Sequence, residues 1–253
     1  MAHDGVAVST LRWLTDPPLD GVTNMARDEA LLERVGRGLS APTLRFYSWA
    51  SPTISLGYFQ SYQEYAALAG PAGDLPAVRR LTGGGAILHD QELTYSLTLP
   101  LDHLLIAGRG PNHLYDHVHG AFAALLTEHG VPVTRGPAGG NGCSQRGPFF
   151  CFARHACFDL LTGGAKLMGS AQRRTTRAVL QHGSLVIDRR FDQQPGAALA
   201  AYIDVDLDTY LPQLADMIAG APVGEAGSWS AGELEEADRL GLKYGSREWT
   251  GRR

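Results

Sequence analysis

Two segments of the chain carry apolar residues at helical spacing. After Asn24, a good N-cap, apolar side chains recur on one face until Gly36 supplies a stop. The same spacing runs from Asn112 to His129 and ends before Gly130. We expect two helices here, each packing its apolar face against a core.

Shorter segments predict a sheet. Residues 93–99 place their larger side chains on one face and three small hydroxyl residues on the other, which predicts a half-buried strand. Residues 44–49 and 53–57 are aromatic or β-branched runs on either side of the Ser51-Pro52 break. We interpret them as neighbouring strands.

The second half of the chain continues the strand pattern. A glycine-rich loop at 136–148 precedes two runs, 158–161 and 167–171, that are joined through Thr162-Gly163-Gly164. This arrangement predicts a hairpin that follows a flexible loop. Residues 179–187 predict a further strand.

The end of the chain is predicted to be helical. Apolar spacing at 207–218 and a capping box of Ser230 and Glu233 indicate two terminal helices. Helices and strands are mixed along the chain without an internal repeat. We therefore expect one α/β (α+β) domain over residues 1–253, with 220–253 as a C-terminal helical extension.

Composition and charge narrow the class of protein. Hydrophobic residues make up 44% and charged residues 19%, while 31 Gly and 14 Pro indicate many turns in a globular chain. A formal charge of −4 provides no general basic field for nucleic acid. Residues 1–16 lack a secretory signal, and no apolar stretch approaches the roughly 20 residues that span a bilayer. We expect a cytoplasmic protein that binds neither nucleic acid nor membrane.

The chain contains three cysteines, Cys143, Cys151 and Cys157. This odd number, in a long chain without an export signal, argues against a disulfide framework. Their spacing contains no C-x-x-C pair, and His155 between two of them completes no usual zinc pattern. We therefore expect free thiols and no metal site.

A glycine run at residues 79–90, RRLTGGGAILHD, is the first candidate for chemistry. Consecutive glycines let a backbone approach a ligand with exposed N–H groups, and adjoining arginines can hold a phosphate or an acidic partner. The alternative is a tight turn with solvated arginines. Neither a Walker loop nor a G-x-G-x-x-G dinucleotide motif is present.

The glycine run is one of several motifs between Asn24 and Ile187 that together resemble a known family. The segments are PTLRFYSW (42–49), SLGYFQ (55–60), CFARHACFDL (151–160), GAKLMGSAQRR (164–174) and LQHGS (180–184). Together with the glycine run, they resemble the octanoyltransferase branch of the family that contains lipoate-protein ligase A, lipoyltransferases and biotin protein ligases.

The resemblance implies a fold, an activity and a site. The fold is the biotin ligase and lipoate ligase catalytic domain, a mostly antiparallel mixed sheet with flanking helices. The activity is octanoyl transfer from acyl carrier protein, through a thioester on Cys151 assisted by Lys166, to a lysine of a lipoyl domain or glycine cleavage H protein, without a cofactor. The residues expected to bind substrate are Gly57, Arg79, Arg80, Gly83, Gly84, Gly85, His89, Asp159, Gly169, Ser170, Ala171 and His182.

Chemistry gives a separate reason to pair Cys151 with Lys166. A thiolate exchanges one thioester for another before an amine attacks, and a nearby ammonium favours that thiolate. The two residues are 15 positions apart and meet if the predicted hairpin folds back. The alternative is a buried apolar cysteine beside Phe149 and Phe150, while Cys143 and Cys157 are interpreted as a loop thiol and a core residue.

Other functions stay open on sequence grounds. Ala156 and Asp159 stand where related transferases often have Ser and Glu, and Gly85 is more typical of ligases. An ATP-dependent lipoate-protein ligase would use Lys166 against phosphate and carboxylate, although the 34 residues after Ala219 are few for the second domain of many such ligases. An octanoyl amidotransferase and a silent lipoyl-domain binder are further alternatives. We expect His89 and His182 to shape the site and assign neither a proton-transfer role.

Overall fold

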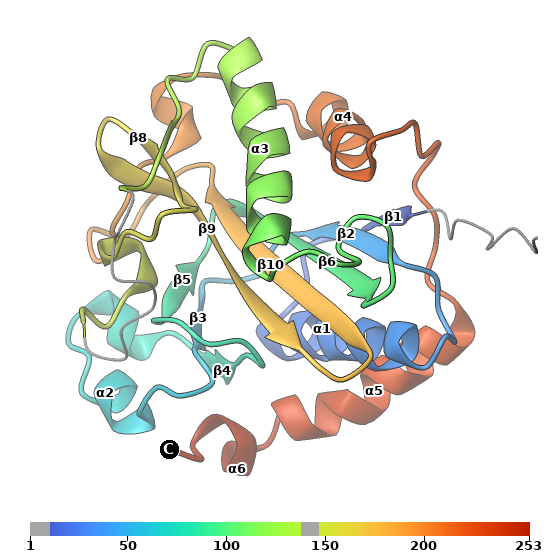
Figure 1. The fold of residues 1–253 in the computed structure, drawn as a ribbon. Helices are drawn as coiled ribbons and strands as arrows, with labels where there is room; N and C mark the ends of the chain where they lie inside the picture. Colours follow the sequence, from blue (N-terminus) through green and yellow to red (C-terminus); the bar gives the residue numbers. More distant parts are fainter. Residues whose placement is uncertain (1–10, 138–146) are drawn as a thin grey trace, which may run out of the picture.

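The structure is a computed structural model that describes residues 11–137 and 147–253 (Figure 1). Its strands are β1 Arg12–Thr15, β2 Thr43–Tyr47, β3 Thr53–Leu56, β4 Ala77–Arg79, β5 Ile87–His89, β6 Glu92–Pro100, β7 Thr134–Arg135, β8 Leu160–Thr162, β9 Ala165–Arg174 and β10 Ala178–Val186. Its α-helices are α1 Gly21–Gly36, α2 Tyr62–Ala66, α3 Asn112–Glu128, α4 Leu207–Ala219, α5 Ala231–Tyr244 and α6 Arg247–Thr250. None of the described helices is long and apolar enough to cross a membrane.

Two sheets organise the chain. The larger has seven strands in the order β1-β2-β6-β10-β9-β8-β7, and only its β1–β2 pair is parallel. The smaller has the order β4-β3-β5, with β3 parallel to β4 and antiparallel to β5. The prediction of a mixed, mostly antiparallel sheet with flanking helices is confirmed.

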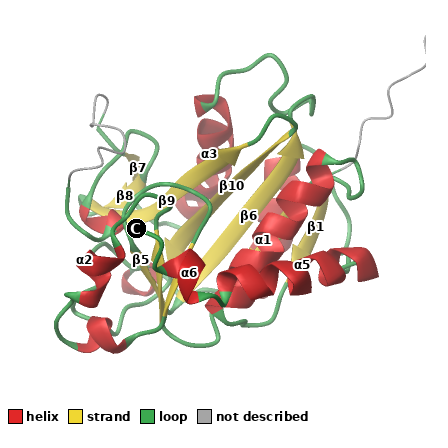
Figure 2. Ribbon diagram, turned by 90° about the horizontal axis from the view of Figure 1, so that it is seen from below, coloured by secondary structure: helices red, strands yellow, loops and turns green. Residues whose placement is uncertain are grey.

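Helices cover both faces of the larger sheet (Figures 1 and 2). Helices α3 and α4 pack on the face that carries Leu93, Tyr95 and Leu97 of β6, whereas α1 lies on the other face with α5 packed along it. The hydroxyl side of β6 is therefore buried too, and Ser96 is fully shielded from solvent. The prediction of a half-buried strand was wrong because a second helical layer covers the polar face.

Helix α1 begins earlier than its sequence pattern suggested. Asp20 is the N-cap, and its side chain accepts a hydrogen bond from the Thr23 N–H at 3.0 Å. Asn24 lies inside the helix, where its side-chain amide donates to the carbonyls of Leu19 and Ser48. The predicted Asn24 cap was wrong, since this amide fixes the preceding loop instead. Helix α3 begins at Asn112, as predicted.

Strands β2 and β3 are not neighbours, contrary to the sequence interpretation. Strand β2 pairs with β1 and β6 in the larger sheet, while β3 pairs with β4 and β5 in the smaller one. Strand β2 ends at Tyr47, and the Ser51-Pro52 break lies between it and β3, where the chain passes from the larger sheet to the smaller one. Tyr47 of β2 and Ser55 of β3 nevertheless line one cavity.

The predicted hairpin and terminal helices are confirmed. Strands β8 and β9 are joined by Gly163 and Gly164, whose positive φ angles of 56° and 78° suit glycine. Helix α5 begins with the complete capping box, in which Ser230 and Glu233 exchange side-chain and backbone hydrogen bonds. The short α6 was not predicted, and the indole of Trp249 there donates to the Arg79 carbonyl at 2.8 Å.

Candidate active site

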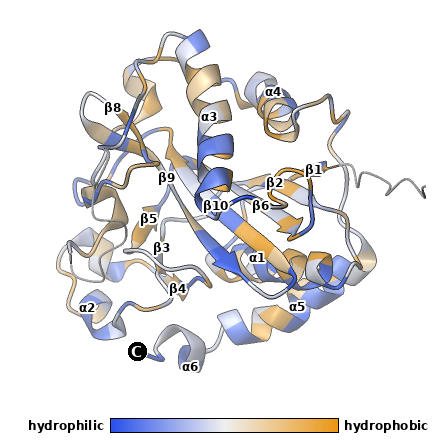
Figure 3. Cartoon of the chain, viewed as in Figure 1, coloured by the Kyte–Doolittle hydropathy of each residue, from blue (hydrophilic) through white to orange (hydrophobic). Residues whose placement is uncertain are grey.

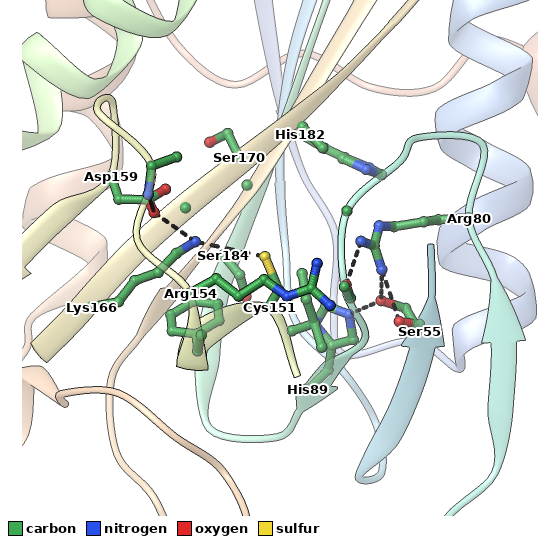
Figure 4. A pocket seen from close by; sticks show the side chains of 18 of the residues that line it. Ser55, Arg80, His89, Cys151, Arg154, Asp159, Lys166, Ser170, His182 and Ser184 are labelled. Carbon is green, nitrogen blue, oxygen red and sulfur yellow. Dashed lines mark hydrogen bonds and ion pairs between the residues drawn. The ribbon is translucent and has the colours of Figure 1, made fainter. Parts of the chain in front are cut away.

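A cavity of about 350 Å³ brings together segments that are far apart in sequence (Figure 4). Twelve of the fourteen predicted site residues line it: Arg80, Gly83, Gly84, Gly85, His89, Cys151, Asp159, Lys166, Gly169, Ser170, Ala171 and His182. Gly57 and Arg79 lie outside the lining. The expectation that the glycine run, His89 and Lys166 share one cavity is met.

The cavity combines an apolar wall with a polar end. Its apolar lining comes from Met25, Tyr47, Trp49, Ile87 and Phe152. None of these five was predicted as a site residue from the sequence. Such a surface suits an aliphatic chain, because apolar area buried there is removed from water. A volume of this size is at the lower end of the range for small-molecule sites.

Cys151 is held against the glycine run by backbone contacts. Its N–H donates to the Ala86 carbonyl at 2.7 Å, and the Ala86 N–H donates to the Phe149 carbonyl at 2.9 Å. A Cβ at Gly85 would lie 2.9 Å from the Phe149 oxygen and 3.0 Å from the Cys151 nitrogen. Gly85 is therefore required for this approach.

The accessibility of the cysteines separates their roles. Cys151 begins a short 3-10 turn and is half-buried in the cavity lining, so it is not the fully enclosed apolar thiol of the alternative interpretation. Cys157 is also half-buried and lies in a turn before β8. Its prediction as a core residue within a strand was wrong, because the strand begins only at Leu160. Cys143 lies outside the described residues.

Lys166 faces Cys151 across the cavity end (Figure 4). Its Nζ lies 3.6 Å from the Cys151 Sγ and 2.9 Å from Oδ2 of Asp159. The same Asp159 oxygen accepts a hydrogen bond from the Ala156 N–H at 2.6 Å. The β8–β9 hairpin thus closes the gap between the two candidate catalytic residues, as predicted.

The surroundings of Lys166 keep it charged. Burial alone would lower its pKa, but the facing Cys151 and Asp159 outweigh this effect and raise the pKa of Lys166 above its ordinary value. Gly169 provides the necessary room, since a Cβ there would lie 2.3 Å from Cε and 2.5 Å from Nζ of Lys166. The site therefore presents an ammonium group directly to the cysteine sulfur.

The Arg80 side chain orients the glycine run. The Arg80 guanidinium is buried and donates to the carbonyls of Gly83 and Gly85 at 2.8 and 2.7 Å. Within the described parts of the chain, the N–H groups of Gly83, Gly84 and Gly85 have no hydrogen-bond partner. The run therefore has unpaired N–H donors next to the cavity, while Arg80 binds the carbonyls of Gly83 and Gly85.

His89 belongs to a buried chain of hydrogen bonds that ends at Arg80. Its Nδ1 lies 2.6 Å from Oε1 of Glu92, its Nε2 lies 2.7 Å from Oγ of Ser55, and Arg80 donates to that Oγ at 3.1 Å. Burial lowers the pKa of His89 even though Glu92 opposes this. The neutral ring, stacked on Trp49 at 3.8 Å, therefore donates to Glu92 and accepts from Ser55.

His182 forms a second chain that converges on the same arginine. Its Nδ1 lies 3.0 Å from Oδ2 of Asp28, and its Nε2 lies 2.7 Å from Oγ1 of Thr82. Arg80 donates from Nε to that Thr82 oxygen at 3.2 Å. Both histidines thus have each ring nitrogen engaged within the protein, an arrangement that fits the pocket-shaping role expected from sequence.

A third histidine was missed by sequence reasoning. His119 of α3 is buried, with Nδ1 against the Phe158 carbonyl and Nε2 2.7 Å from Oγ of Ser170. Tyr95 contacts the same Oγ at 2.8 Å. Burial lowers the pKa of His119 to about 4, so the neutral ring accepts the Ser170 hydroxyl. The available signal was a histidine on the apolar face of a predicted helix.

Arg79 and Gly57 support the site from outside. Arg79 is fully buried and donates from Nη1 to the Gly57 carbonyl at 2.8 Å, and from Nε and Nη2 to the Thr250 carbonyl. A Cβ at Gly57 would lie 2.0 Å from the Gly84 oxygen, so Gly57 admits the glycine run. The expectation that Arg79 binds substrate is therefore not supported, because its guanidinium N–H groups donate to backbone carbonyls.

Comparison with known proteins finds a matching family and several named relatives. The lipoyl protein ligase A/B catalytic domain matches residues 20–205. Octanoyltransferase LipM of Moorella thermoacetica is 45% identical over 180 residues, which cover 70% of this chain and 65% of that protein. Octanoyltransferase LipM of Carboxydothermus hydrogenoformans is 36% identical over 187 residues, which cover 74% and 68%. The chain spans just under two thirds of the Moorella relative.

Solved structures share the fold. A lipoate-protein ligase A bound with ATP superposes with a TM-score of 0.75 at 22% identity, covering 95% of this chain and 97% of that chain. A bi-partite lipoate protein ligase from Thermoplasma acidophilum, described with its E2 lipoyl domain, gives 0.73 at 19% identity and covers 96% of each chain. At these identities the likeness concerns the fold. Because the family match extends over residues 20–205 of 253, the chain belongs to the lipoyl protein ligase A/B catalytic domain family.

Proposed function

We propose that this protein transfers an octanoyl group from acyl carrier protein, through a thioester on Cys151, to a lysine of a lipoyl domain or glycine cleavage H protein. The observation that carries the proposal is the 3.6 Å contact between the Lys166 ammonium and the Cys151 sulfur at the end of an apolar cavity. Relatives named octanoyltransferase LipM support the choice of acyl group.

The first half of the reaction is thioester exchange. The Cys151 thiolate, stabilised by the Lys166 ammonium, attacks the donor carbonyl and forms a tetrahedral oxyanion. The Cys151 N–H is engaged with Ala86, so we assign oxyanion stabilisation to free N–H groups of the glycine run. The carbon–sulfur bond to the donor then breaks, and Lys166 gives its proton to the departing thiolate.

The second half returns the site to its starting state. The neutral Lys166 amine accepts a proton from the incoming acceptor lysine, whose free amine attacks the thioester on Cys151. The amide forms as the bond to Cys151 breaks, and its nitrogen releases one proton to solvent and keeps the other as the amide N–H. Cys151 is regenerated as a thiolate beside the Lys166 ammonium, so neither ATP nor a metal enters the balance.

Incubation with octanoyl-acyl carrier protein in the absence of ATP tests the proposal. We expect the intact mass of the protein to rise by one octanoyl group, and the adduct to disappear when a lipoyl domain is added. A requirement for ATP and free acid would instead support the ligase alternative. Transfer from an octanoylated lipoyl protein, measured in parallel, would identify amidotransferase activity, and absence of any adduct would favour a silent binder.

The space at Gly169 provides a second test. Gly169→Ala should push the Lys166 ammonium away from Cys151, because the new Cβ would lie only 2.3 Å from Cε and 2.5 Å from Nζ. We expect octanoyl transfer to fall about 10- to 100-fold, the scale of an ångström-sized misplacement in a catalytic group. The measurement is the rate of adduct formation by quenched-flow mass spectrometry.

Gly241→Ala is the matched control for that substitution. Gly241 lies in α5 with nothing within 4 Å of the added Cβ. Alanine there should leave transfer unchanged and stabilise the helix by up to about 1 kcal/mol. Equal transfer rates in Gly169→Ala and Gly241→Ala would show that the position of Lys166 does not limit the reaction.

A further inference from the structure

We propose that Arg173, Arg252 and Arg253, called here the rim arginines, form a docking surface for the anionic carrier of the acyl donor. The inference rests on the proposed function and extends it to recognition of the donor. The surface lies beside the glycine run, where the end of β9 meets the chain that follows α6. Figure 3 shows hydrophilic residues at both places.

The rim arginines gather around one aromatic ring. The Cζ atom of Arg252 lies 3.9 Å from the centroid of the Tyr58 ring, that of Arg173 lies 5.4 Å away, and that of Arg253 lies 5.9 Å away. Arg253 also contacts the ring of Phe59 at 5.2 Å. Folding thus brings residues 58, 173 and 252, which are far apart in the sequence, to a common point.

Among the described residues, no Asp or Glu side chain forms an ion pair with Arg173, Arg252 or Arg253, so side-chain carboxylates do not neutralise this cluster of positive charge. The pKa of Tyr58 is lowered by its hydrogen bond from Arg252, and further by the charges of Arg173 and Arg253, as expected in a positive field. The chain as a whole carries a formal charge of −4. A local excess of cations on an acidic protein fits an anionic partner.

The surface is continuous with the cavity wall. A Cβ at Gly83, which lines the cavity, would lie 3.9 Å from the Phe59 ring, and Phe59 is 53% exposed. Gly57, which precedes Tyr58 and Phe59, packs against the Gly84 carbonyl. An exposed aromatic side chain beside arginines is typical of protein interfaces.

Arg79 gives the surface its fixed geometry. Its guanidinium binds the Thr250 carbonyl at 2.8 and 3.0 Å, and its own carbonyl accepts the Trp249 indole N–H. The Arg253 carbonyl in turn accepts the Tyr62 N–H at 2.6 Å. The first arginine of the glycine-run motif therefore anchors the segment that presents Arg252 and Arg253.

Charge favours the donor over the acceptor as the occupant. A carrier-bound thioester sits on an arm that contains a phosphodiester, a permanent anion, and the carrier surface can add carboxylates. The acceptor presents a lysine ammonium, and three arginines would repel it. Phosphate and carboxylate share the chemistry that the rim arginines recognise, so the two sources are separated by experiment.

The test replaces each rim arginine with glutamine and compares two donors. With octanoyl-acyl carrier protein at low salt, kcat/KM for Cys151 acylation should fall about 2- to 5-fold for Arg173→Gln or Arg252→Gln. The triple variant should lose about 10- to 50-fold if the effects add. The neutral octanoyl thioester of N-acetylcysteamine should react at the wild-type rate with every variant.

Arg174→Gln is the matched control, because Arg174 is the next residue of β9, is equally exposed and carries the same charge. Its Nε donates to the Gln172 side chain, and it makes no contact with the Tyr58 ring among the described residues. We expect its kinetics with octanoyl-acyl carrier protein to match wild type. If Arg174→Gln lowered kcat/KM as much as Arg173→Gln, the effect would depend only on the net charge of the protein, and the proposal would be overturned.

A further donor shows which anion the rim arginines bind. Octanoyl-coenzyme A carries phosphates without a carrier protein, so a lower kcat/KM of the rim variants with this donor identifies the phosphate. A lower kcat/KM only with octanoyl-acyl carrier protein identifies the carboxylates of the carrier. Either result supports the docking surface. Equal loss with the neutral thioester would indicate a structural defect, and loss confined to lipoyl-domain KM would assign the surface to the acceptor. Both of these results would overturn the proposal.

A binding measurement separates this proposal from the proposed function. Affinity for octanoyl-acyl carrier protein, followed by fluorescence anisotropy, needs no chemistry at Cys151. If wild-type protein forms no adduct but the rim variants still lose affinity, the docking surface stands and the transferase proposal falls. If adducts form normally and affinity is unchanged in the triple variant, the docking surface alone is wrong.

Discussion

Replacing Cys151 with alanine is expected to abolish the octanoyl adduct and to lower transfer to a lipoyl domain by at least about three orders of magnitude. The reason is that the substitution removes the sulfur nucleophile, which lies 3.6 Å from the Lys166 ammonium. The variant should remain folded, since Cys151 is only half-buried and its backbone contacts to Ala86 do not need the side chain. Intact-mass analysis and a lipoyl-domain transfer assay measure the two effects.

Cys157→Ala is the control for thiol reactivity. Cys157 is half-buried like Cys151, but it does not line the cavity. Both Cys157→Ala and Cys143→Ala should keep the adduct and the transfer rate. A Cys151→Ala variant that still modifies a lipoyl domain at the wild-type rate, and only with ATP and free acid, would replace the transferase proposal with the ligase alternative.

The proximity of Cys151 and Lys166 was predictable because it depends on local structure. The turn at Gly163 and Gly164 joins two strands of strong β pattern, and a hairpin returns the second strand beside the first. The cysteine therefore had only to lie shortly before the hairpin. The glycine run was recognised from its motif instead, because the steric requirement for Gly85 comes from Phe149 and Cys151, which are distant in the sequence.

The roles of Arg79 and Arg80 could not be read in the same way. The sequence shows two arginines beside a glycine run, a pattern that predicts binding of an anion by the guanidinium groups. In the fold, both guanidinium groups satisfy buried backbone carbonyls, which would otherwise remain without partners. One such partner, the Thr250 carbonyl, lies 171 positions from Arg79, and no local pattern predicts a contact of that span.

The separation of β2 from β3 and the role of His119 have a comparable origin. Two consecutive strands are often neighbours, and only the pairing of β3 with β4 and β5 assigns it to another sheet. In the sequence, His119 is a single polar residue on the apolar face of a predicted helix, and nothing there identifies its partner. Its bond to Ser170 of β9 depends on how α3 crosses the sheet, which is a tertiary property.

Lys166→Met should combine a loss of stability with a loss of activity. Methionine keeps much of the side-chain volume but removes the charge, and Asp159 is left buried without the partner that lies 2.9 Å away. Breaking a buried pair in this way costs about 3–5 kcal/mol of unfolding free energy. The double variant Lys166→Met with Asp159→Asn removes both charges, so it should recover much of the stability while acylation stays slow. Urea unfolding and adduct formation measure the two properties separately.

The pH dependence of acylation distinguishes an electrostatic role for Lys166 from a purely structural one. The folded pKa of Lys166 is raised above 10.5, so the ion pair stabilises the fold fully below that pH, and its contribution is lost only as pH rises through the folded pKa. Wild-type Lys166 therefore stays charged in assays between pH 7 and 9. The stabilised double variant should acylate about 10- to 100-fold more slowly than wild type near pH 7, and the difference should narrow toward pH 9, because higher pH favours a thiolate even without a nearby ammonium. A constant ratio across this range, or full activity at pH 7, would show that Lys166 does not assist ionisation of the Cys151 thiol.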